Sequence, residues 1–210
     1  MATISKLASS QYITSKCHSR ENNDIKFIIP HHMEAHWTGT QCAQYFVNNG
    51  VGTSANYCIG YNGDISCNVP EDYAAYTSGS QQADKRSVTI ECSDTTKTNF
   101  EIPAKTQESL IQLMVDLIQR YPSLGGKAVY DESDRDLVVA AKNGKGSWDA
   151  VKGNIILHEW TTLSGTTCPG WHMKQILPSL VAEVNKRLAG ASSSTTKSGS
   201  ELEGSAASTR

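Results

Sequence analysis

The sequence lacks both an excess of basic residues and a long apolar run. Lys and Arg number 19 against 21 Asp and Glu, so the formal net charge is −2 and no basic field attracts nucleic acid. The most apolar window, residues 109–118, is interrupted by Gln112 and Asp116, whereas a membrane helix needs roughly 18 apolar residues. We therefore expect no nucleic-acid partner and no membrane insertion.

The N-terminus lacks the apolar central segment of a secretory signal peptide. Its first residues, Met1–Ser10, mix Thr, Ser and Lys with isolated apolar side chains. We therefore expect the protein to be made in the cytoplasm, so that any action outside the cell follows its release by another agent.

Cysteine is scarce for a disulfide-stabilised fold. The 210 residues contain six cysteines and no Cys-x-x-Cys pair. Cys58 and Cys67 are equidistant from Asn62 and Gly63, so a two-residue hairpin loop at that pair would place the two thiols directly opposite. They could form a disulfide or remain reduced neighbours, and the missing signal peptide favours the reduced form.

Large apolar side chains are almost absent from residues 190–210. This segment is rich in Gly, Ser and Thr, has no aromatic residue, and carries Leu202 as its only large apolar side chain. It cannot bury enough surface to order itself, so we predict one folded domain over residues 1–189 and a flexible linker or tail over 190–210. Terminal linkers commonly lead to a second module, which in a longer protein would follow Arg210.

Hydrophobic periodicity predicts alternating strands and helices in the folded domain. The apolar run 25–29, ended by Pro30, and the alternating segment 87–92 are typical of strands. Residues 107–121 place apolar side chains on one helical face, with Thr106 as the expected N-cap. Interleaved strands and helices indicate the α/β class, with a central mixed sheet flanked by helices. The other expected strands are 57–61, 64–69 and 154–157, and the other expected helices are 41–48 and 172–188.

Histidine and cysteine side chains at the ends of predicted elements could converge on one site. His31 and His32 follow the first strand. His158 follows the strand at 154–157, and Cys168 precedes a Pro-Gly turn. Two histidines and one cysteine form a three-ligand set that suits zinc and leaves a fourth position for water, as in catalytic zinc sites. From spacing alone, these residues could also be strand-end histidines and a packed thiol.

Three motifs occur in a fixed order along the chain. They are Ile28–Met33 (IIPHHM), Ser87–Asp94 (SVTIECSD), and His158–Trp160 (HEW) leading to Thr167–Gly170 (TCPG). In these motifs the sequence resembles the zinc-dependent N-acetylmuramoyl-L-alanine amidases, which include phage lysozyme-type endolysins, muropeptide-recycling amidases and animal peptidoglycan-recognition proteins. The resemblance covers residues 15–188 and is nearest to endolysins and autolysins of Gram-positive hosts. It implies the amidase type 2, peptidoglycan-recognition-like fold.

The resemblance assigns roles to particular residues. It implies that His31, His158 and Cys168 bind Zn²⁺. A slip of one residue would exchange His31 for His32 as the first ligand. Glu91 matches the acidic residue that, in the family, accepts a proton from the zinc-bound water and returns it to the leaving amine. Without the family, a lone glutamate at a strand end would be interpreted as a solvated charge.

Two positions depart from the family pattern, Thr166 and Glu159, and the first concerns catalysis. Many relatives carry a lysine two residues before the cysteine ligand, thought to stabilise the oxyanion, where this chain has Thr166. A threonine hydroxyl donates a hydrogen bond but brings no charge, so either zinc supplies more of the stabilisation or another donor contributes. We include Thr166 with Glu91 among the expected catalytic residues.

The resemblance also implies a substrate, which is bacterial peptidoglycan. The expected reaction is hydrolysis of the amide between N-acetylmuramic acid and L-alanine by the catalytic domain of a phage endolysin or autolysin. We expect a monomer that acts on the cell wall after release, and a longer protein could carry a C-terminal cell-wall-binding module. One alternative is a non-catalytic peptidoglycan-binding module, which Cys168 disfavours because such members typically lose the cysteine ligand. The other is a cytosolic amidase that trims recycled muropeptides.

Overall fold

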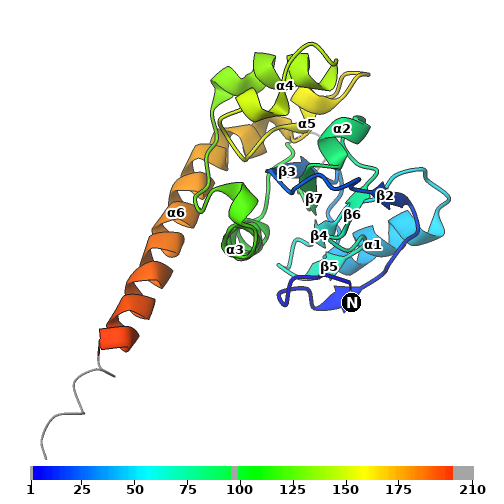
Figure 1. The fold of residues 1–210 in the computed structure, drawn as a ribbon. Helices are drawn as coiled ribbons and strands as arrows, with labels where there is room; N and C mark the ends of the chain where they lie inside the picture. Colours follow the sequence, from blue (N-terminus) through cyan, green and yellow to red (C-terminus); the bar gives the residue numbers. More distant parts are fainter. Residues whose placement is uncertain (1, 96–98, 201–210) are drawn as a thin grey trace, which may run out of the picture.

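A five-stranded mixed sheet forms the centre of the computed structural model (Figure 1). The structure describes residues 2–95 and 99–200, with side chains described through residue 191. The strands of this sheet are β1 (Ser10–Gln11), β3 (Phe27–His32), β4 (Tyr57–Ile59), β5 (Ile65–Cys67) and β7 (Ser87–Cys92). Their order is β1-β5-β4-β7-β3, in which β4 and β5 are antiparallel and the other neighbours are parallel. The predicted mixed sheet is confirmed.

The remaining elements are a small second sheet and the helices. β2 (Cys17–Ser19) and β6 (Tyr73–Ala75) pair antiparallel. The α-helices are α1 (Gly39–Asn48), α2 (Gln81–Asp84), α3 (Ala104–Arg120), α4 (Arg135–Lys142), α5 (His158–Thr161) and α6 (Gly170–Ser200). Short 3-10 helices cover Pro122–Leu124, Glu132–Asp134 and Trp148–Ala150.

Helices cover both faces of the central sheet (Figure 1). α3 and α6 pack against each other and against one face, where their apolar side chains form the main core with residues such as Tyr57 and Ile90. α1 covers the other face, and its Cys42 and Phe46 form a smaller core with Cys58. Because both faces bury apolar side chains, the sheet is enclosed, as the α/β prediction requires.

Local signals explain where the helices begin and end. Thr38 caps α1: its hydroxyl accepts from the Gln41 backbone N–H at 3.1 Å, and the Gln41 side chain accepts from the Thr38 N–H at 2.9 Å. Gly50, at φ +63°, follows the end of this helix. The expectation that Thr106 caps α3 is wrong. Pro103 holds the N-cap position, and Thr106 is buried inside the first turns of the helix.

The side chains of β7 alternate as the sequence predicts. Val88 and Ile90 join the main core. Glu91 therefore faces the opposite side of the sheet, the side that α1 covers. His31 in β3 and Cys58 in β4 both pair with Glu91, so these three side chains form a row across three strands on one face.

β3 continues beyond the predicted stop at Pro30 and includes His31 and His32. Proline has no N–H to donate, but Pro30 has the same orientation as Ile28, whose N–H bonds the Asn154 carbonyl at 2.8 Å on the outer edge of the strand. The missing donor therefore lies on the side away from β7. The pairing of β3 with β7 remains intact and carries both histidines to the end of the sheet.

The β4–β5 hairpin corrects the predicted pairing of Cys58 with Cys67. Cys58 lies opposite Ser66, so the two thiols face opposite sides of the sheet, one in each core, and both are free. The Gly60 N–H bonds the Asp64 carbonyl at 2.9 Å, which closes a three-residue loop. One loop residue more than the predicted pair shifts the register by one position, which moves every side chain to the other face.

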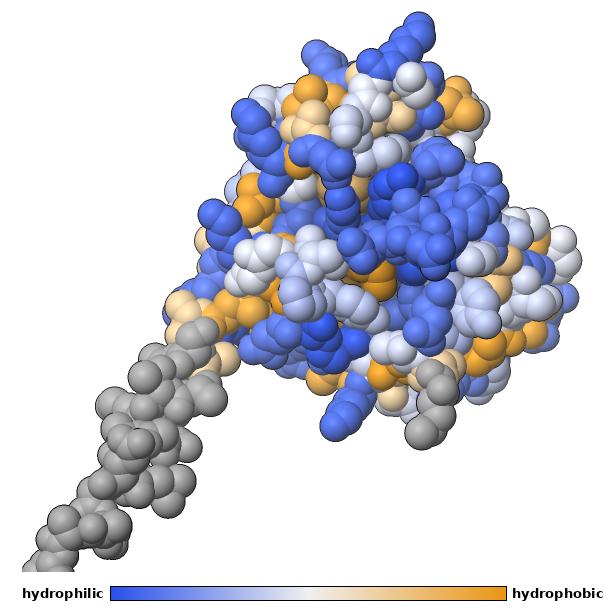
Figure 2. All heavy atoms as spheres, in the orientation of Figure 1, coloured by the Kyte–Doolittle hydropathy of each residue, from blue (hydrophilic) through white to orange (hydrophobic). Residues whose placement is uncertain are grey.

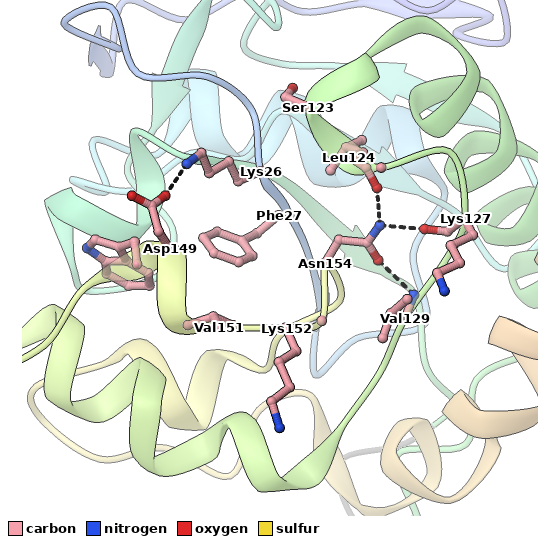
Figure 3. Close-up of a pocket in the computed structure, with 13 residues that line it drawn as sticks. Lys26, Phe27, Ser123, Leu124, Lys127, Val129, Asp149, Val151, Lys152 and Asn154 are labelled. Carbon is pink, nitrogen blue, oxygen red and sulfur yellow. Dashed lines mark hydrogen bonds and ion pairs between the residues drawn. The ribbon is translucent and has the colours of Figure 1, made fainter.

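The predicted strand at 154–157 is wrong. This segment makes a single bridge, Ile28 with Ile155, beside the edge strand β3. Side-chain hydrogen bonds from Asn154, and not a strand ladder, hold it in place (Figure 3). The Asn154 amide donates to the carbonyls of Leu124 and Lys127, each at 2.6 Å, and accepts from the Val129 N–H at 2.8 Å.

α6 crosses the predicted end of the folded domain. The helix runs through Pro178 to Ser200, so helical backbone covers part of the segment 190–210. Residues 201–210 lie outside the described part of the chain. The boundary at residue 189 and the linker character of the tail stay predictions.

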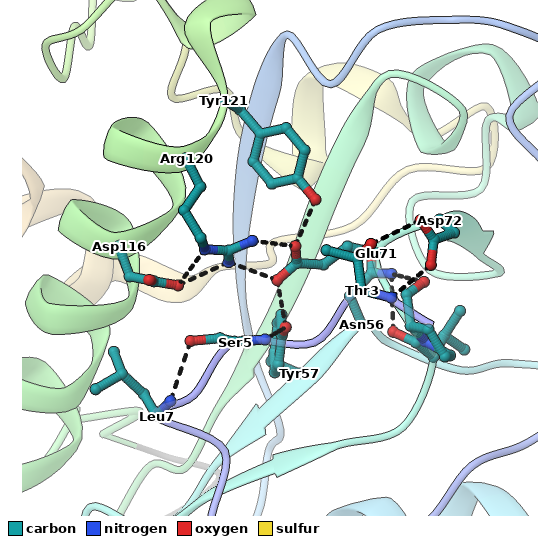
Figure 4. A network of polar contacts seen from close by, with 12 residues as sticks. Thr3, Ser5, Leu7, Asn56, Tyr57, Glu71, Asp72, Asp116, Arg120 and Tyr121 are labelled. Atoms are coloured by element: carbon teal, nitrogen blue, oxygen red, sulfur yellow. Dashed lines mark hydrogen bonds and ion pairs between the residues drawn. The ribbon is translucent and has the colours of Figure 1, made fainter. Parts of the chain in front are cut away.

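A buried carboxylate joins the loop before β6 to α3 (Figure 4). The Glu71 side chain is 0% exposed and accepts hydrogen bonds from the hydroxyls of Tyr57 and Tyr121. The Arg120 guanidinium donates to both carboxylate oxygens, at 2.7 and 2.8 Å. The Ser5 N–H donates to the Tyr57 hydroxyl at 2.7 Å, which ties the N-terminal segment to the same cluster. We call Tyr57, Glu71, Arg120 and Tyr121 the Glu71 network.

The exposed surface is mostly hydrophilic on the face shown in Figure 2, with apolar residues in smaller groups. The most exposed large apolar side chains include Leu163 and Trp171, which lie on either side of Cys168 in the sequence. Within residues 2–95 and 99–200, no helix is both long and apolar enough to span a membrane.

Candidate metal centre

Three elements bring two histidines and one cysteine together. His31 lies near the end of β3, His158 begins α5, and Cys168 lies in the loop before α6. One ligand atom from each residue lies within 4.8 Å of the others. The Cys168 Sγ is 3.5 Å from the His31 Nδ1, and the two imidazole centroids are 4.5 Å apart. We call these three residues the metal group, because a single ion could contact all of them.

The sheet register explains why His31, and not His32, belongs to this group. Adjacent residues of a strand face opposite sides, and His31 faces the same side as its partner Glu91. The His32 Nδ1 instead lies 3.0 Å from an Asp94 carboxylate oxygen, and its ring packs edge-on against Phe100. The geometry thus groups His31 with the other two predicted ligands.

Hydrogen bonds and anchored backbone position His158. The 154–157 segment, fixed through Asn154, leads directly into α5 and places His158 beside the end of β3. The His158 carbonyl accepts from the Thr161 hydroxyl and from the Thr162 N–H, each at 3.0 Å, which stabilises the helical turn that carries the histidine.

Burial keeps the metal group uncharged when no cation is present. Desolvation lowers the pKa of His158 to about 4 and the pKa of His31 well below its ordinary value, with the neighbouring histidines adding to both shifts. Desolvation also raises the pKa of the Cys168 thiol well above its ordinary value. The buried His31 Nε2 and His158 Nδ1 have no hydrogen-bond partner. Neutral imidazoles with free nitrogens are competent metal ligands, and a bound cation would stabilise the thiolate.

Glu91 lies beside the metal group on the same face of the sheet. Burial, together with the smaller effects of the Asp94 and Glu34 charges, raises the pKa of its carboxyl to about 8. Its Oε2 is buried without a hydrogen-bond partner. A carboxyl group with a raised pKa and a free oxygen can accept a proton and give it back near neutral pH.

The metal group and Glu91 line a cavity of about 730 Å³. Sequence reasoning did not find several of its other lining residues, because no local pattern marks them. One of these, Glu34, has a positive φ of +52° in the loop after β3. The others come from the same loop and from α1 and include His36, Tyr45 and Phe46.

Thr166 lies apart from this cavity. Its hydroxyl accepts from the Cys168 backbone N–H at 3.1 Å, which stabilises the turn that carries the cysteine. The residue is exposed and lines a second cavity, of about 650 Å³, on the other side of His158. The catalytic role of Thr166 stays a prediction that its position does not favour.

The aromatic residues near the centre differ in exposure. Trp37 lines the cavity over the metal group, and Tyr76 lines the second cavity. Trp160 is buried and stacks on Tyr130, with ring centroids 5.9 Å apart, so it serves the core. Trp171 is half exposed and lines neither cavity.

A further cavity, of about 270 Å³, lies away from the metal group (Figure 3). Its lining contains no histidine or cysteine. Lys26 is paired with Asp149, and Asn154 is bonded to three backbone groups. Lys26, Asp149 and Asn154 therefore stabilise the fold through these bonds, whereas atoms of the metal group have no partner.

Comparison with protein families identifies the family of this chain. Residues 21–171 match the model of the family described as N-acetylmuramoyl-L-alanine amidase. The chain belongs to this family. The matched residues include His31, Glu91, His158 and Cys168, so the resemblance found in the sequence motifs is confirmed at the level of the family.

Solved structures of other amidases share the fold. A selenomethionine AmpD derivative is 16% identical with a TM-score of 0.61, covering 85% of this chain and 96% of its own. A mutant endolysin from Bacillus subtilis is 17% identical with a TM-score of 0.53, over 84% and 99% of the two chains. The endolysin amidase LysCS from Clostridium intestinale URNW is 15% identical with a TM-score of 0.52, over 82% and 96%. No curated protein matches the sequence.

Proposed function

We propose that the protein is a zinc-dependent amidase that cleaves the bond between the lactyl carbonyl of N-acetylmuramic acid and L-alanine in peptidoglycan. The observation that carries the proposal is the metal group, which lies in one cavity beside Glu91, whose Oε2 is buried without a hydrogen-bond partner. Membership of the amidase family supports the reaction class. We propose further that the domain acts as a phage endolysin or autolysin, as a monomer and after release to the wall.

The donor set of the metal group fits zinc. Two imidazoles and one thiolate are three of the ligands that zinc prefers, and they leave a fourth position towards the cavity. The His31 Nε2 and the His158 Nδ1 are buried without a hydrogen-bond partner, and the Cys168 Sγ lies 3.5 Å from the His31 Nδ1. When bound there, zinc would polarise the scissile carbonyl and lower the pKa of a water molecule to about 7.

Glu91 moves the proton in this proposal. Its free Oε2 accepts a proton from the attacking water, whose oxygen bonds to the carbonyl carbon. The same carboxyl then gives the proton to the alanine nitrogen as the carbon–nitrogen bond breaks. Burial among Asp94 and Glu34, which raises the pKa of Glu91 to about 8, favours holding the proton between the two steps.

The test is digestion of purified cell walls by the zinc-loaded protein. We expect new N-terminal alanine to appear and no new reducing sugar ends, because only the amide is cut. Glu91→Ala, loaded with zinc to the same extent, should release far less. New reducing ends without new alanine termini would contradict the proposal.

The same assay separates the two alternatives. A peptidoglycan-binding module would bind the walls without releasing alanine termini. A muropeptide-recycling amidase would cleave soluble fragments and leave intact walls undigested. The metal group together with Glu91 supports an enzyme, because binding alone requires neither a free carboxylate nor free ligand nitrogens.

A further inference from the structure

The cavity over the metal group is acidic and has no cationic side chain in its described lining. Glu34 and Glu91 contribute carboxylates, and none of the lining residues is Lys or Arg. Glu91 is partly buried beside the metal group, whereas the Glu34 side chain is about half exposed, at 54%. A substrate that enters this cavity therefore meets the exposed negative charge of Glu34 and, apart from a cation held by the metal group, no Lys or Arg that could pair with a negative charge of its own.

The backbone around Glu34 is held firmly against the end of β7. Glu34 has a φ of +52°, a conformation that residues other than glycine rarely adopt. On one side of it, the Met33 N–H bonds the Cys92 carbonyl at 2.9 Å. On the other side, the Ala35 carbonyl accepts from the Asp94 N–H at 3.2 Å. The carboxylate therefore projects from a fixed point on the rim of the cavity.

The Glu34 carboxylate is not neutralised by its neighbours. Its nearest basic atom in the described residues is the His32 Nε2, at 4.0 Å, which is beyond hydrogen-bond distance. Glu34 lines the same cavity as the metal group. An ammonium group on the substrate would supply the missing partner.

Aromatic rings line the same cavity as Glu34. Trp37 and Tyr45 lie with their ring centroids 5.2 Å apart. Rings of this kind pack against methylene chains and attract ammonium groups through their faces. An aliphatic side chain that ends in an ammonium group therefore matches both features of the cavity.

We propose that Glu34 selects stem peptides whose diamino acid offers a side-chain ammonium and no side-chain carboxylate. This is the lysine type of peptide, in preference to the diaminopimelate type. The ammonium donates a hydrogen bond to Glu34, while the extra carboxylate of diaminopimelate meets no Lys or Arg in the described lining. This inference rests on the proposed amidase function and adds the substrate class.

Three soluble substrates test the inference. They are N-acetylmuramoyl-L-alanyl-γ-D-glutamyl-L-lysine, the same compound acetylated on the lysine side chain, and the analogue with meso-diaminopimelate. For the zinc-loaded wild type we expect kcat/KM to be about tenfold higher for the free lysine compound than for either other substrate, mainly through KM. Acetylation removes only the charge, so it isolates the contribution of the ammonium group.

Glu34→Gln keeps the size of the side chain and removes its charge. We expect its preference among the three substrates to fall to within about twofold. The matched control is Glu183→Gln, because Glu183 pairs with Lys186 and Arg187 on α6 and does not line the cavity. The control should keep the full preference, and both variants should contain as much zinc as the wild type.

Several results would overturn the inference. They are equal kcat/KM values of the wild type for the three substrates, a tenfold preference that survives in Glu34→Gln, and loss of zinc from Glu34→Gln. The first two would leave the amidase function intact. If the zinc-loaded wild type cleaves none of the compounds, the proposed function fails separately. Calorimetric binding of the same compounds then tests Glu34, and equal affinity for lysine and acetyl-lysine would reject its role.

Discussion

Two buried polar clusters of this protein differ in how fully their atoms are satisfied. In the Glu71 network, both carboxylate oxygens accept hydrogen bonds from tyrosine and arginine donors. Around the metal group, buried atoms of three side chains, His31, Glu91 and His158, have no partner. A buried polar atom without a partner costs folding free energy, whereas a satisfied network contributes to stability. The Glu71 network therefore stabilises the fold, whereas the unpartnered atoms around the metal group remain available to bind a ligand.

Removal of the metal is expected to cause the largest loss of activity. It should affect the metal group and leave the Glu71 network unchanged. Treatment with a chelator should reduce wall hydrolysis to background, because the Lewis acid and the activated water are lost. Adding back zinc should restore the release of N-terminal alanine. Protein donors satisfy both carboxylate oxygens of the Glu71 network, so the far-ultraviolet circular dichroism should remain that of the folded protein. Full activity in protein shown to be free of metal would contradict the proposed role of the metal group.

Glu91→Ala is expected to lower kcat by roughly 100- to 10,000-fold, the usual contribution of a general acid and base. The zinc content should not change, because Glu91 is not a member of the metal group. Steady-state kinetics on the soluble lysine substrate, together with metal analysis, measures both quantities. Unchanged turnover would remove Glu91 from the mechanism.

Glu71→Ala should separate stability from activity. The change leaves Arg120 and two tyrosine hydroxyls without their acceptor, and we expect the free energy of unfolding to fall by about 3 kcal/mol. The expected decrease in Tm is roughly 6–12 °C, measured by thermal denaturation. At a temperature where the variant is folded, its zinc content and kcat should equal those of the wild type.

Asp72→Ala is the matched control for this change. Asp72 is the next residue, but it is exposed and bonds only to Thr3 near the N-terminus. We expect its removal to lower the free energy of unfolding by less than about 1 kcal/mol. A loss of zinc from Glu71→Ala, or equal destabilisation by the two changes, would contradict the conclusion that the Glu71 network stabilises the fold without taking part in metal binding.

Thr166→Ala is expected to have the smallest effect. Its hydroxyl bonds the Cys168 N–H and lies outside the cavity of the metal group, so kcat should fall by less than about threefold. Thr166→Ser keeps the hydroxyl and should behave as the wild type. Loss of a hydrogen-bond donor to the oxyanion would cost roughly 100- to 1,000-fold, and such a fall in the alanine variant alone would establish the catalytic role.

The sequence was sufficient where the information is periodic or carried by motifs. The alternation of β7 predicted which face Glu91 occupies, and the apolar run before His31 located β3. Family motifs then selected His31, His158 and Cys168, which the fold brings within 4.8 Å of one another. Spacing alone could not select them, because these residues are distant along the chain.

The errors arose where one residue decides the geometry. A third residue in the β4–β5 loop shifts the register, so Cys58 faces Ser66 and not Cys67. Proline usually ends a strand, but Pro30 lies on a free edge, which only the sheet order reveals. Glu34 was not found because a positive φ at a glutamate leaves no signal in the local sequence.

Metal content per chain tests whether His31, His158 and Cys168 bind zinc. We expect one zinc ion in the wild-type protein and none in His158→Ala or Cys168→Ser, whereas Glu71→Gln should retain the ion. Both ligand variants should remain folded, because buried ligand nitrogens that have no hydrogen-bond partner add little to the stability of the fold. A wild-type protein that binds no zinc when the metal is supplied in excess, or ligand variants that keep it, would contradict the account.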